Sequence, residues 1–207
     1  MTTHSEEQRT ALRARVIAQR KALTDEQLQR AAHALSHLFE STPEYQQATA
    51  IAAYWPVRGE ADARPLLERA LIAGKRVYLP IVRADSTLLF APYDADTPME
   101  NNRLGIPEPQ VAAERLAAPR DLDLVILPLT AFDDAGNRLG MGGGFYDRSF
   151  AFLRDEVRQR PVLAGAAHEF QHSERLPVCD WDVPAQLVVT DERVHRPQAD
   201  LYEAAAH

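Results

Sequence analysis

The chain contains 207 residues, of which 45% are hydrophobic and 26% are charged. This length and composition are typical of one globular domain, which we expect to span residues 1–207. The only cysteine is Cys179, which excludes an intramolecular disulfide and a multi-thiolate metal site. The formal net charge of -7 argues against broad nucleic-acid binding, although it allows a local basic pocket for a small anion.

The polar start of the chain lacks the apolar core of a secretory signal. The longest apolar stretch, residues 122–132, contains Asp123 and Pro128 and is well short of the roughly 20 residues that span a bilayer. We therefore expect a cytoplasmic protein that has neither a membrane nor a nucleic acid as its partner.

The N-terminal third is predicted to be mainly helical. On a helix near residues 6–21, Arg9, Arg13 and Arg20 project within about 40° of one another, beside an apolar stripe. This basic edge has two interpretations. It binds phosphate, or it is a solvated helix face, since arginines are mostly exposed.

Two further helices are marked by their end signals. Thr24 and Gln27 have capping-box spacing before an apolar stripe, which predicts an amphipathic helix. Residues 63–71 also follow helical spacing, with Asp62 available as a cap and Gly74 placed to end the helix.

Short, nearly continuous apolar runs with helical segments between them predict the strands. Such runs suit a sheet that is covered on both faces, as in a mostly parallel arrangement. We therefore predict a three-layer α/β/α fold with a mostly parallel open sheet, in which the first two strands and the helix between them form a βαβ unit. The predicted strands are residues 50–54, 76–80, 88–92, 122–128, 162–167 and 187–190.

The segment 97–119 carries several prolines and shows no clear hydrophobic period. We predict a long surface loop there, with at most a short helix. Loops of this kind often line binding sites.

The most informative motif is the glycine-rich stretch RLGMGGGFYDR at residues 138–148. Four glycines within five residues remove the side chains that would keep phosphate oxygens away from backbone N–H groups. A helix that starts at the end of this run would add the attraction of its N-terminus. Together with the arginines at both ends, the motif points to nucleotide chemistry.

A carboxylate and an aromatic ring follow the first predicted strand, at Glu60 and Trp55. This is where an open α/β sheet places its ligand-binding loops. Glu60 either hydrogen-bonds a heterocycle or is a turn residue paired with Arg58 or Arg64, because surface charges are common. Trp55 either stacks on a ligand ring or fills the core.

Two carboxylates are candidate Mg²⁺ ligands. Asp147 directly follows the glycine run, close enough to hold Mg²⁺ against a bound phosphate, and Asp182 would supply a second oxygen. Both have an alternative role as helix caps. Asp133 and Asp134 are interpreted as parts of the turn over residues 132–136.

One competing motif is His168-Glu169-Phe170-Gln171-His172, which matches the H-E-x-x-H pattern of zinc hydrolases. That pattern needs a helix, so that both histidines face one ion. The preceding residues 162–167 are predicted to form a buried strand, which places His168 at a strand end. The zinc hydrolase is therefore kept only as a remote alternative.

At these motifs the chain resembles the 5-formyltetrahydrofolate cyclo-ligase family, also called methenyltetrahydrofolate synthetase. The resemblance covers nearly the whole chain, and its most specific part is the segment 131–148. Its other motifs are Leu12-Arg13, Glu60, KRVYLP at 75–80, LGIPEP at 104–109, DLVILP at 123–128, Leu176-Pro177, Asp182 and Thr190.

The resemblance implies ATP- and Mg²⁺-dependent conversion of 5-formyltetrahydrofolate to 5,10-methenyltetrahydrofolate, with release of ADP and phosphate. ATP would phosphorylate the formyl oxygen, N10 would attack the activated carbon, and phosphate would leave, so no protein nucleophile is required. This division is sensible because phosphorylation turns a poor leaving group into a good one.

The resemblance also implies roles for individual residues. Glu60 would orient the pterin, Trp55 and Tyr146 would contact the folate, and Asp147 with Asp182 would organise Mg²⁺. The implied ATP-binding residues are Arg9, Arg13, Arg138, Leu139, Gly140, Met141, Gly142, Gly143, Gly144, Phe145, Tyr146 and Arg148.

Two residues depart from the family pattern, which often has lysine at the position of Arg9 and tyrosine at the position of Phe145. Arginine keeps the charge but presents a planar fork in place of a compact ammonium. We expect a monomeric cyclo-ligase whose substrates are ATP and 5-formyltetrahydrofolate. The main alternative is a non-catalytic regulatory relative that binds nucleotide and folate.

Overall fold

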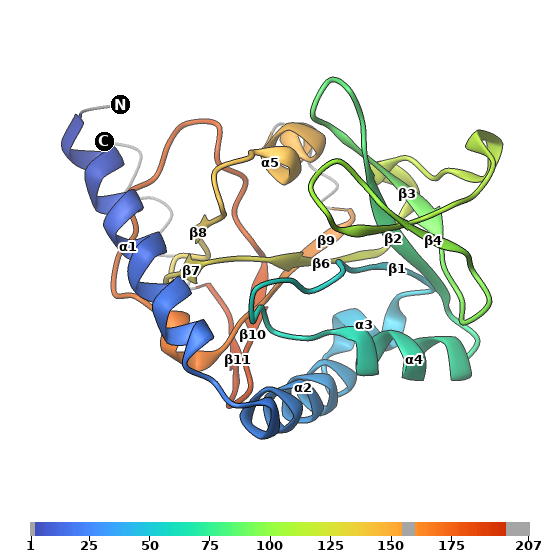
Figure 1. The fold of residues 1–207 in the computed structure, drawn as a ribbon, viewed down its shortest axis with the longest axis horizontal. Helices are drawn as coiled ribbons and strands as arrows, with labels where there is room; N and C mark the ends of the chain where they lie inside the picture. The colour runs from blue at the N-terminus through green and yellow to red at the C-terminus, as the bar shows by residue number, and fades with distance from the viewer. Residues whose placement is uncertain (1–2, 155–159, 198–207) are drawn as a thin grey trace.

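The computed structural model describes residues 3–154 and 160–197, arranged around a seven-stranded sheet (Figure 1). The strand order is β11-β10-β9-β6-β1-β2-β3. The five inner strands β10, β9, β6, β1 and β2 are parallel, whereas β3 and β11 run antiparallel at the two edges. The strands are β1 (Ala50–Ala52), β2 (Arg76–Val82), β3 (Leu88–Pro92), β6 (Leu124–Pro128), β9 (Val162–Ala166), β10 (Leu187–Val189) and β11 (Val194–His195).

All six predicted strands are present, and the short edge strand β11 is an addition. Their apolar runs are continuous because both faces of the sheet are buried. On one face, Ile51 and Leu124 pack with Leu35 of α2 and Leu66 of α4. On the other face, neighbouring strand residues such as Val125 pack with the segment around α5. The three-layer α/β/α prediction is therefore confirmed.

The helices are unequal in length and place. Helices α2, α3 and α4 cover one face, α5 lies over the other, and α1 runs along the side of the molecule where the parallel strands end (Figure 1). None of the helices within the described residues is long and apolar enough to cross a membrane. The helices are α1 (Thr3–Lys21), α2 (Asp25–Glu40), α3 (Pro43–Gln47), α4 (Arg64–Ile72) and α5 (Phe145–Ser149).

The predicted helix ends follow local chemistry. The capping box before α2 is confirmed: Thr24 Oγ1 accepts the Gln27 N–H at 3.2 Å, and Gln27 Oε1 accepts the Thr24 N–H at 2.8 Å. Helix α4 ends before Gly74, whose φ of +74° suits glycine. Asp62 accepts the Arg64 N–H at 2.9 Å, but it lies one residue before the N-cap position.

The prediction of a long loop over 97–119 was wrong in part. The segment contains a two-stranded antiparallel ribbon, β4 (Met99–Asn101) and β5 (Pro107–Pro109), followed by two 3₁₀ turns. Its turn is closed by Asn102, whose Oδ1 accepts the N–H groups of Leu104 and Ile106. The prolines concealed the ribbon because proline donates no hydrogen bond and seldom occurs within a strand.

Candidate functional site

A cavity of about 680 Å³ opens where the parallel strands β1, β2 and β6 end. Helix α1 forms one wall, the turn between β4 and β5 forms another, and the glycine-rich segment closes a third. Ligand sites in open α/β sheets lie at this carboxyl edge. The cavity is lined by most of the predicted site residues: Arg9, Arg13, Trp55, Glu60, Arg138, Gly140, Met141, Gly142, Gly143, Gly144, Phe145, Tyr146, Asp147 and Asp182.

Two predicted residues do not present their side chains to this cavity. Leu139 belongs to strand β8 (Arg138–Leu139) and is buried against Ala131 and Leu176. Arg148 is exposed and donates hydrogen bonds to the carbonyl groups of Ser86 and Gly143. Their predicted contacts with ATP stay predictions.

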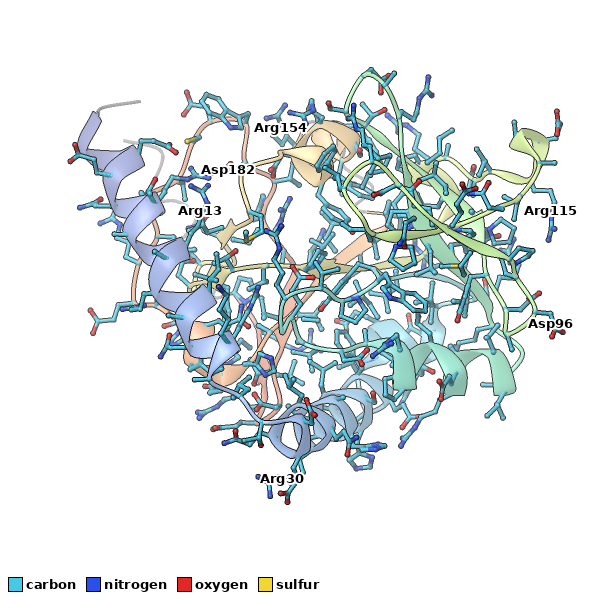
Figure 2. All side chains as sticks on the ribbon, viewed as in Figure 1. Arg13, Arg30, Asp96, Arg115, Arg154 and Asp182 are labelled. Carbon is cyan, nitrogen blue, oxygen red and sulfur yellow. The ribbon has the colours of Figure 1, made fainter. Side chains whose placement is uncertain are left out.

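The arginines of α1 are not a solvated helix face. Arg9 is only 7% exposed and Arg20 only 3%. Arg9 Nη1 lies 3.2 Å from Asp182 Oδ2, and Arg138 Nη2 lies 2.8 Å from Asp147 Oδ1. Figure 2 shows Arg13, also on α1, on the side of the helix toward the segment that carries Asp182.

These arginines keep unused donors. The Nε atoms of Arg9, Arg20 and Arg138 are buried and have no hydrogen-bond partner within the described part of the chain. A buried donor without a partner costs about 1–3 kcal/mol, more for a charged group. Such donors are rare in folded proteins and point to a partner outside the protein chain.

The glycine-rich segment has a backbone conformation that requires glycine at two positions. Gly142 and Gly144 have φ angles of +100° and +63°, which residues with a Cβ rarely adopt. A Cβ on Gly144 would lie 2.8 Å from Arg148 Nη1. Arg13 Nε donates to the Gly140 carbonyl at 2.9 Å, which ties the segment to α1.

A helix does begin at the end of the glycine run, as predicted. It is α5, which starts at Phe145 and is five residues long. So short a helix adds little dipole. The attraction for an anion therefore comes chiefly from the arginines.

Glu60 is a buried carboxylate that also lines the cavity. Its Oε2 accepts the Val57 N–H at 3.1 Å, and its Oε1 lies 3.9 Å from Arg20 Nη1. Burial raises the pKa of Glu60 and lowers the pKa of Arg20. The alternative pairing with Arg64 is wrong, because Arg64 pairs with Asp62 at 2.7 Å.

Aromatic side chains border Glu60. Trp55 is half-buried, meets Tyr93 edge-on at 6.3 Å between ring centroids, and has the Arg64 guanidinium 5.3 Å from its centroid. Tyr146 stacks on Phe150 with 6.3 Å between the ring centroids, and burial raises the pKa of its hydroxyl. The Tyr146 hydroxyl is therefore a neutral donor at physiological pH.

The two candidate Mg²⁺ ligands, Asp147 and Asp182, lie in the same cavity. Asp147 Oδ1 accepts hydrogen bonds from Arg138 and from the Val183 N–H, so it does not cap α5, whose N-cap is Gly144. Asp182 Oδ2 accepts the Cys179 N–H at 3.0 Å as well as Arg9. Carboxylate oxygens are the donors that Mg²⁺ prefers, and each of these two carboxylates is also paired with a buried arginine.

The H-E-x-x-H interpretation was wrong. Residues 169–171 form one 3₁₀ turn, not an α-helix. His168 is buried, with Nε2 3.1 Å from the Gly59 carbonyl, whereas His172 Nε2 faces Asp134 at 2.8 Å. The two rings have different partners, so they do not share an ion. Asp133, by contrast, closes the predicted turn by accepting the N–H groups of Ala135 and Asn137.

Three lining features were missed from the sequence. Arg20 was counted on the basic edge of α1 but had no site role, and it is the partner of Glu60. Tyr54 lines the cavity and donates to the Ala61 carbonyl. The turn around Leu104 and Ile106 also lines the cavity, and the LGIPEP motif was the signal that could have identified it.

Comparison with known sequences gives a consistent result. A model of the 5-formyltetrahydrofolate cyclo-ligase family matches residues 5–191. The 5-formyltetrahydrofolate cyclo-ligase of Escherichia coli (strain K12) is 40% identical over 177 residues, which are 84% of this chain and 96% of that protein. The Haemophilus influenzae protein of the same name is 41% identical over 68% of this chain and 75% of its own length.

Solved structures agree with the sequences. The NMR structure of Aquifex aeolicus 5,10-methenyltetrahydrofolate synthetase superposes with a TM-score of 0.77 and 30% identity, over 92% of this chain and 93% of that one. A 5,10-methenyltetrahydrofolate synthetase from Mycoplasma pneumoniae superposes with a TM-score of 0.67 and 25% identity, over 89% and 99% of the two chains.

Proposed function

Since the chain belongs to the 5-formyltetrahydrofolate cyclo-ligase family, it is an ATP-dependent ligase that forms the methenyl product, and we propose that the cavity at the carboxyl edge of the sheet binds both of its substrates. The observation that carries this proposal is the make-up of the cavity lining. Arg9 and Arg138, each with an unused Nε donor, line the cavity with the glycine segment, and we take these as its arginine end. Glu60, its partner Arg20 and aromatic side chains line the same cavity, and we take these as its folate end.

The reaction needs activation of the formyl group. The formyl oxygen attacks the terminal phosphorus of ATP, the phosphorus–oxygen bond to ADP breaks, and ADP leaves. N10 then attacks the formyl carbon and loses its proton, and the carbon–oxygen bond to phosphate breaks. The protein needs only to position the partners and offset negative charge.

The arginine end suits the phosphates of ATP. Arg9, Arg13 and Arg138 line the same cavity as the glycine segment, and Arg13 is bonded to it through the Gly140 carbonyl. The Nε atoms of Arg9 and Arg138 have no acceptor among the described residues. Charge-assisted bonds from guanidinium to phosphate are the strong class of hydrogen bond. We assign Asp147 and Asp182 to Mg²⁺, which when bound offsets charge on the transferring phosphoryl group.

The other end suits the folate. Glu60 is anchored by the Val57 N–H and by Arg20, so its carboxylate presents a fixed acceptor to the donor groups of a pterin ring. Trp55 offers a face for the ring system, and Tyr146, which is close enough to Glu60 for the two to interact electrostatically, offers a neutral donor in the same cavity. No side chain is assigned as a covalent nucleophile.

The test is to mix the purified protein with 5-formyltetrahydrofolate, ATP and Mg²⁺, to record methenyl product by absorbance, and to run a control that lacks ATP. We expect product only with ATP. Folded protein that binds ATP but forms no product would favour the non-catalytic relative instead. Omission and titration of Mg²⁺ in the same assay test the metal assignment.

We also propose that the protein acts as a monomer in the cytoplasm. Light scattering at assay concentration tests this, and a dimer mass would overturn it.

A further inference from the structure

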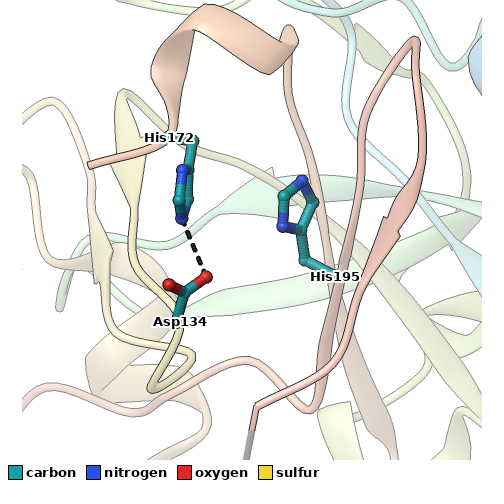
Figure 3. Close-up of side chains that lie close together, drawn as sticks. All are labelled: Asp134, His172 and His195. Carbon is teal, nitrogen blue, oxygen red and sulfur yellow. Dashed lines mark hydrogen bonds and ion pairs between the residues drawn. The ribbon is translucent and has the colours of Figure 1, made fainter. Parts of the chain in front are cut away.

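Three segments that are far apart in the sequence meet at a second cluster of side chains. Asp134 lies in the turn between β7 (Ala131–Phe132) and β8, His172 follows the 3₁₀ turn 169–171, and His195 is on β11. Each offers a ligand atom, and these atoms all lie within 4.8 Å of one another (Figure 3). None of the three residues lines the substrate cavity, so this cluster is separate from the proposed active site.

We propose that Asp134, His172 and His195 form a binding site for a transition-metal ion of the Zn²⁺ class. Two imidazoles and one carboxylate are a donor set that suits Zn²⁺, Co²⁺ or Ni²⁺. Mg²⁺ prefers oxygen donors alone, so this site would not compete for the metal of the cyclo-ligase reaction. Three protein ligands on a partly exposed surface leave a fourth position for water.

A hydrogen bond to one nitrogen of His195 orients the ring so that its other nitrogen can bind a metal. Its Nε2 lies 2.9 Å from Glu169 Oε2, which occupies this nitrogen and leaves Nδ1 as the ligand atom. Figure 3 shows His195 with a ring nitrogen on the side of His172 and Asp134. A carboxylate that orients the far nitrogen of an imidazole is the usual surrounding of a metal-binding histidine.

Glu169 is itself firmly held. Its Oε2 accepts the Thr190 hydroxyl at 2.7 Å, and its Oε1 lies 3.1 Å from Arg193 Nε. Arg193 offsets the charge of Glu169, so the carboxylate that contributes net negative charge to the ion is Asp134. The second carboxylate therefore orients His195 and does not compete as a ligand.

The rings are already positioned side by side. The centroids of His172 and His195 are 5.1 Å apart with an interplanar angle of 27°, and Phe132 packs against both. Tetrahedral Zn²⁺ with bonds of about 2.0–2.1 Å places its ligand atoms about 3.4 Å apart. Because the ligand atoms lie within 4.8 Å of one another, their separations must close by up to about 1.4 Å. The side chains of Asp134 and His172 are 55% and 31% exposed, which leaves both room to move.

The experiment uses untagged full-length protein that has been treated with a chelator and titrated with Zn²⁺ by calorimetry and with Co²⁺ by visible absorbance. We expect one equivalent of metal to bind, and we expect Zn²⁺ to raise the melting temperature because it binds the folded state. His172→Gln and Asp134→Asn should each weaken the affinity for Zn²⁺ by at least 10-fold.

The matched control is the double variant His33→Gln with His37→Gln. These two exposed histidines are four residues apart on α2 and are the competing place for a transition metal. We expect this variant to bind as the parent does. Equal affinity in His172→Gln and the parent, loss of binding in the α2 variant, or the absence of a stoichiometric site would each overturn the proposal.

A loss of binding counts only for variants that melt cooperatively without metal. Asp134→Asn provides this safeguard, because Asp134 is exposed and its substitution removes no buried contact. If Asp134→Asn is folded and still binds Zn²⁺ like the parent, Asp134 is not a ligand and the three-ligand site is refuted.

Discussion

The amino and carboxyl edges of the parallel sheet differ in whether their polar groups have hydrogen-bond partners within the protein. At the amino edge, Asp123 Oδ2 accepts the N–H and the hydroxyl of Thr49 and the N–H of Ala50. Lys75 Nζ at the same edge donates to the carbonyl groups of Tyr45, Gln46 and Ala48. At the carboxyl edge, three buried arginine Nε atoms have no partner among the described residues.

This difference separates stability from function. A polar group whose bonds are all made inside the protein contributes to folding, whereas a buried donor left unpaired destabilises the fold. The saturated amino edge helps to offset the cost of the open carboxyl edge. Substitutions at the two edges should therefore have different effects.

The largest effect is expected for Arg138→Ala at the carboxyl edge. It removes a proposed phosphate donor and leaves Asp147 without its arginine, so we expect kcat/KM to fall on the order of 100-fold or more. The assay is methenyl formation at saturating Mg²⁺. The control is Arg160→Ala at the amino edge, an exposed arginine 3.3 Å from Asp123, which should keep full activity. Comparable losses in both variants would break the distinction between the edges.

Next in size is Asp123→Ala at the amino edge. Three hydrogen bonds to one carboxylate oxygen are lost, so the free energy of unfolding should fall by about 2 kcal/mol, with kcat unchanged. The measurement is urea denaturation. Glu26→Ala, which removes an exposed ion pair with Arg30, is the control and should cost less than about 0.5 kcal/mol.

The stability difference between Asp123→Ala and the parent should also depend on pH. Burial by itself would raise the pKa of Asp123, but the hydrogen bonds from Thr49 and Ala50 outweigh it and hold the pKa below its usual value of 3.8. The stabilisation is therefore present above pH 3.8 and is lost as the pH falls through the lowered pKa. A stability difference from the parent that persists unchanged in stronger acid would contradict this.

Glu60→Gln tests whether folate and ATP are bound by different residues at the carboxyl edge. We expect the KM for 5-formyltetrahydrofolate to rise about 10- to 20-fold, because a charged acceptor for the pterin is lost, while the KM for ATP stays the same. Initial rates with each substrate varied in turn provide the measurement. Equal changes in the two constants would reject the assignment of Glu60 to the folate end.

Arg13→Ala should have the complementary but smaller effect. It removes one proposed phosphate contact and the bond to the Gly140 carbonyl, so the KM for ATP should rise about 5- to 10-fold. The control is Arg15→Ala, an exposed arginine on the same helix. An unchanged KM for ATP in Arg13→Ala would exclude its role.

The smallest effect is expected for His168, a carboxyl-edge residue whose ring nitrogen is bonded to the Gly59 carbonyl. Burial lowers the pKa of His168 below 6.5, so its stabilisation is present above pH 6.5 and is lost as the pH falls below it. His168→Phe keeps the buried volume and should reduce the fall in melting temperature between pH 7 and pH 5 by about 1–3 °C. An unaltered pH slope would show that His168 is not responsible.

Much of the fold was predicted from patterns among residues that are close together in the sequence. Continuous apolar runs identified the six main strands because both faces of the sheet are buried, and the spacing of Thr24 and Gln27 identified the start of α2. The glycine segment was equally clear, since positive φ angles at Gly142 and Gly144 require residues without a Cβ. These signals depend on neighbours within a few residues, so one sequence suffices to detect them.

The partners of the site residues were decided by tertiary structure alone. Arg9 meets Asp182 across 173 positions of the chain. Arg20 lies 3.9 Å from Glu60, and Arg58 also acts on this carboxylate, whereas Arg64 pairs with Asp62. The H-E-x-x-H pattern likewise depended on a helix that does not form, so His172 joins Asp134 and His195 instead of His168. Residue types and local spacing specify which chemistry is available, but only the packing of distant segments determines which charges become buried together.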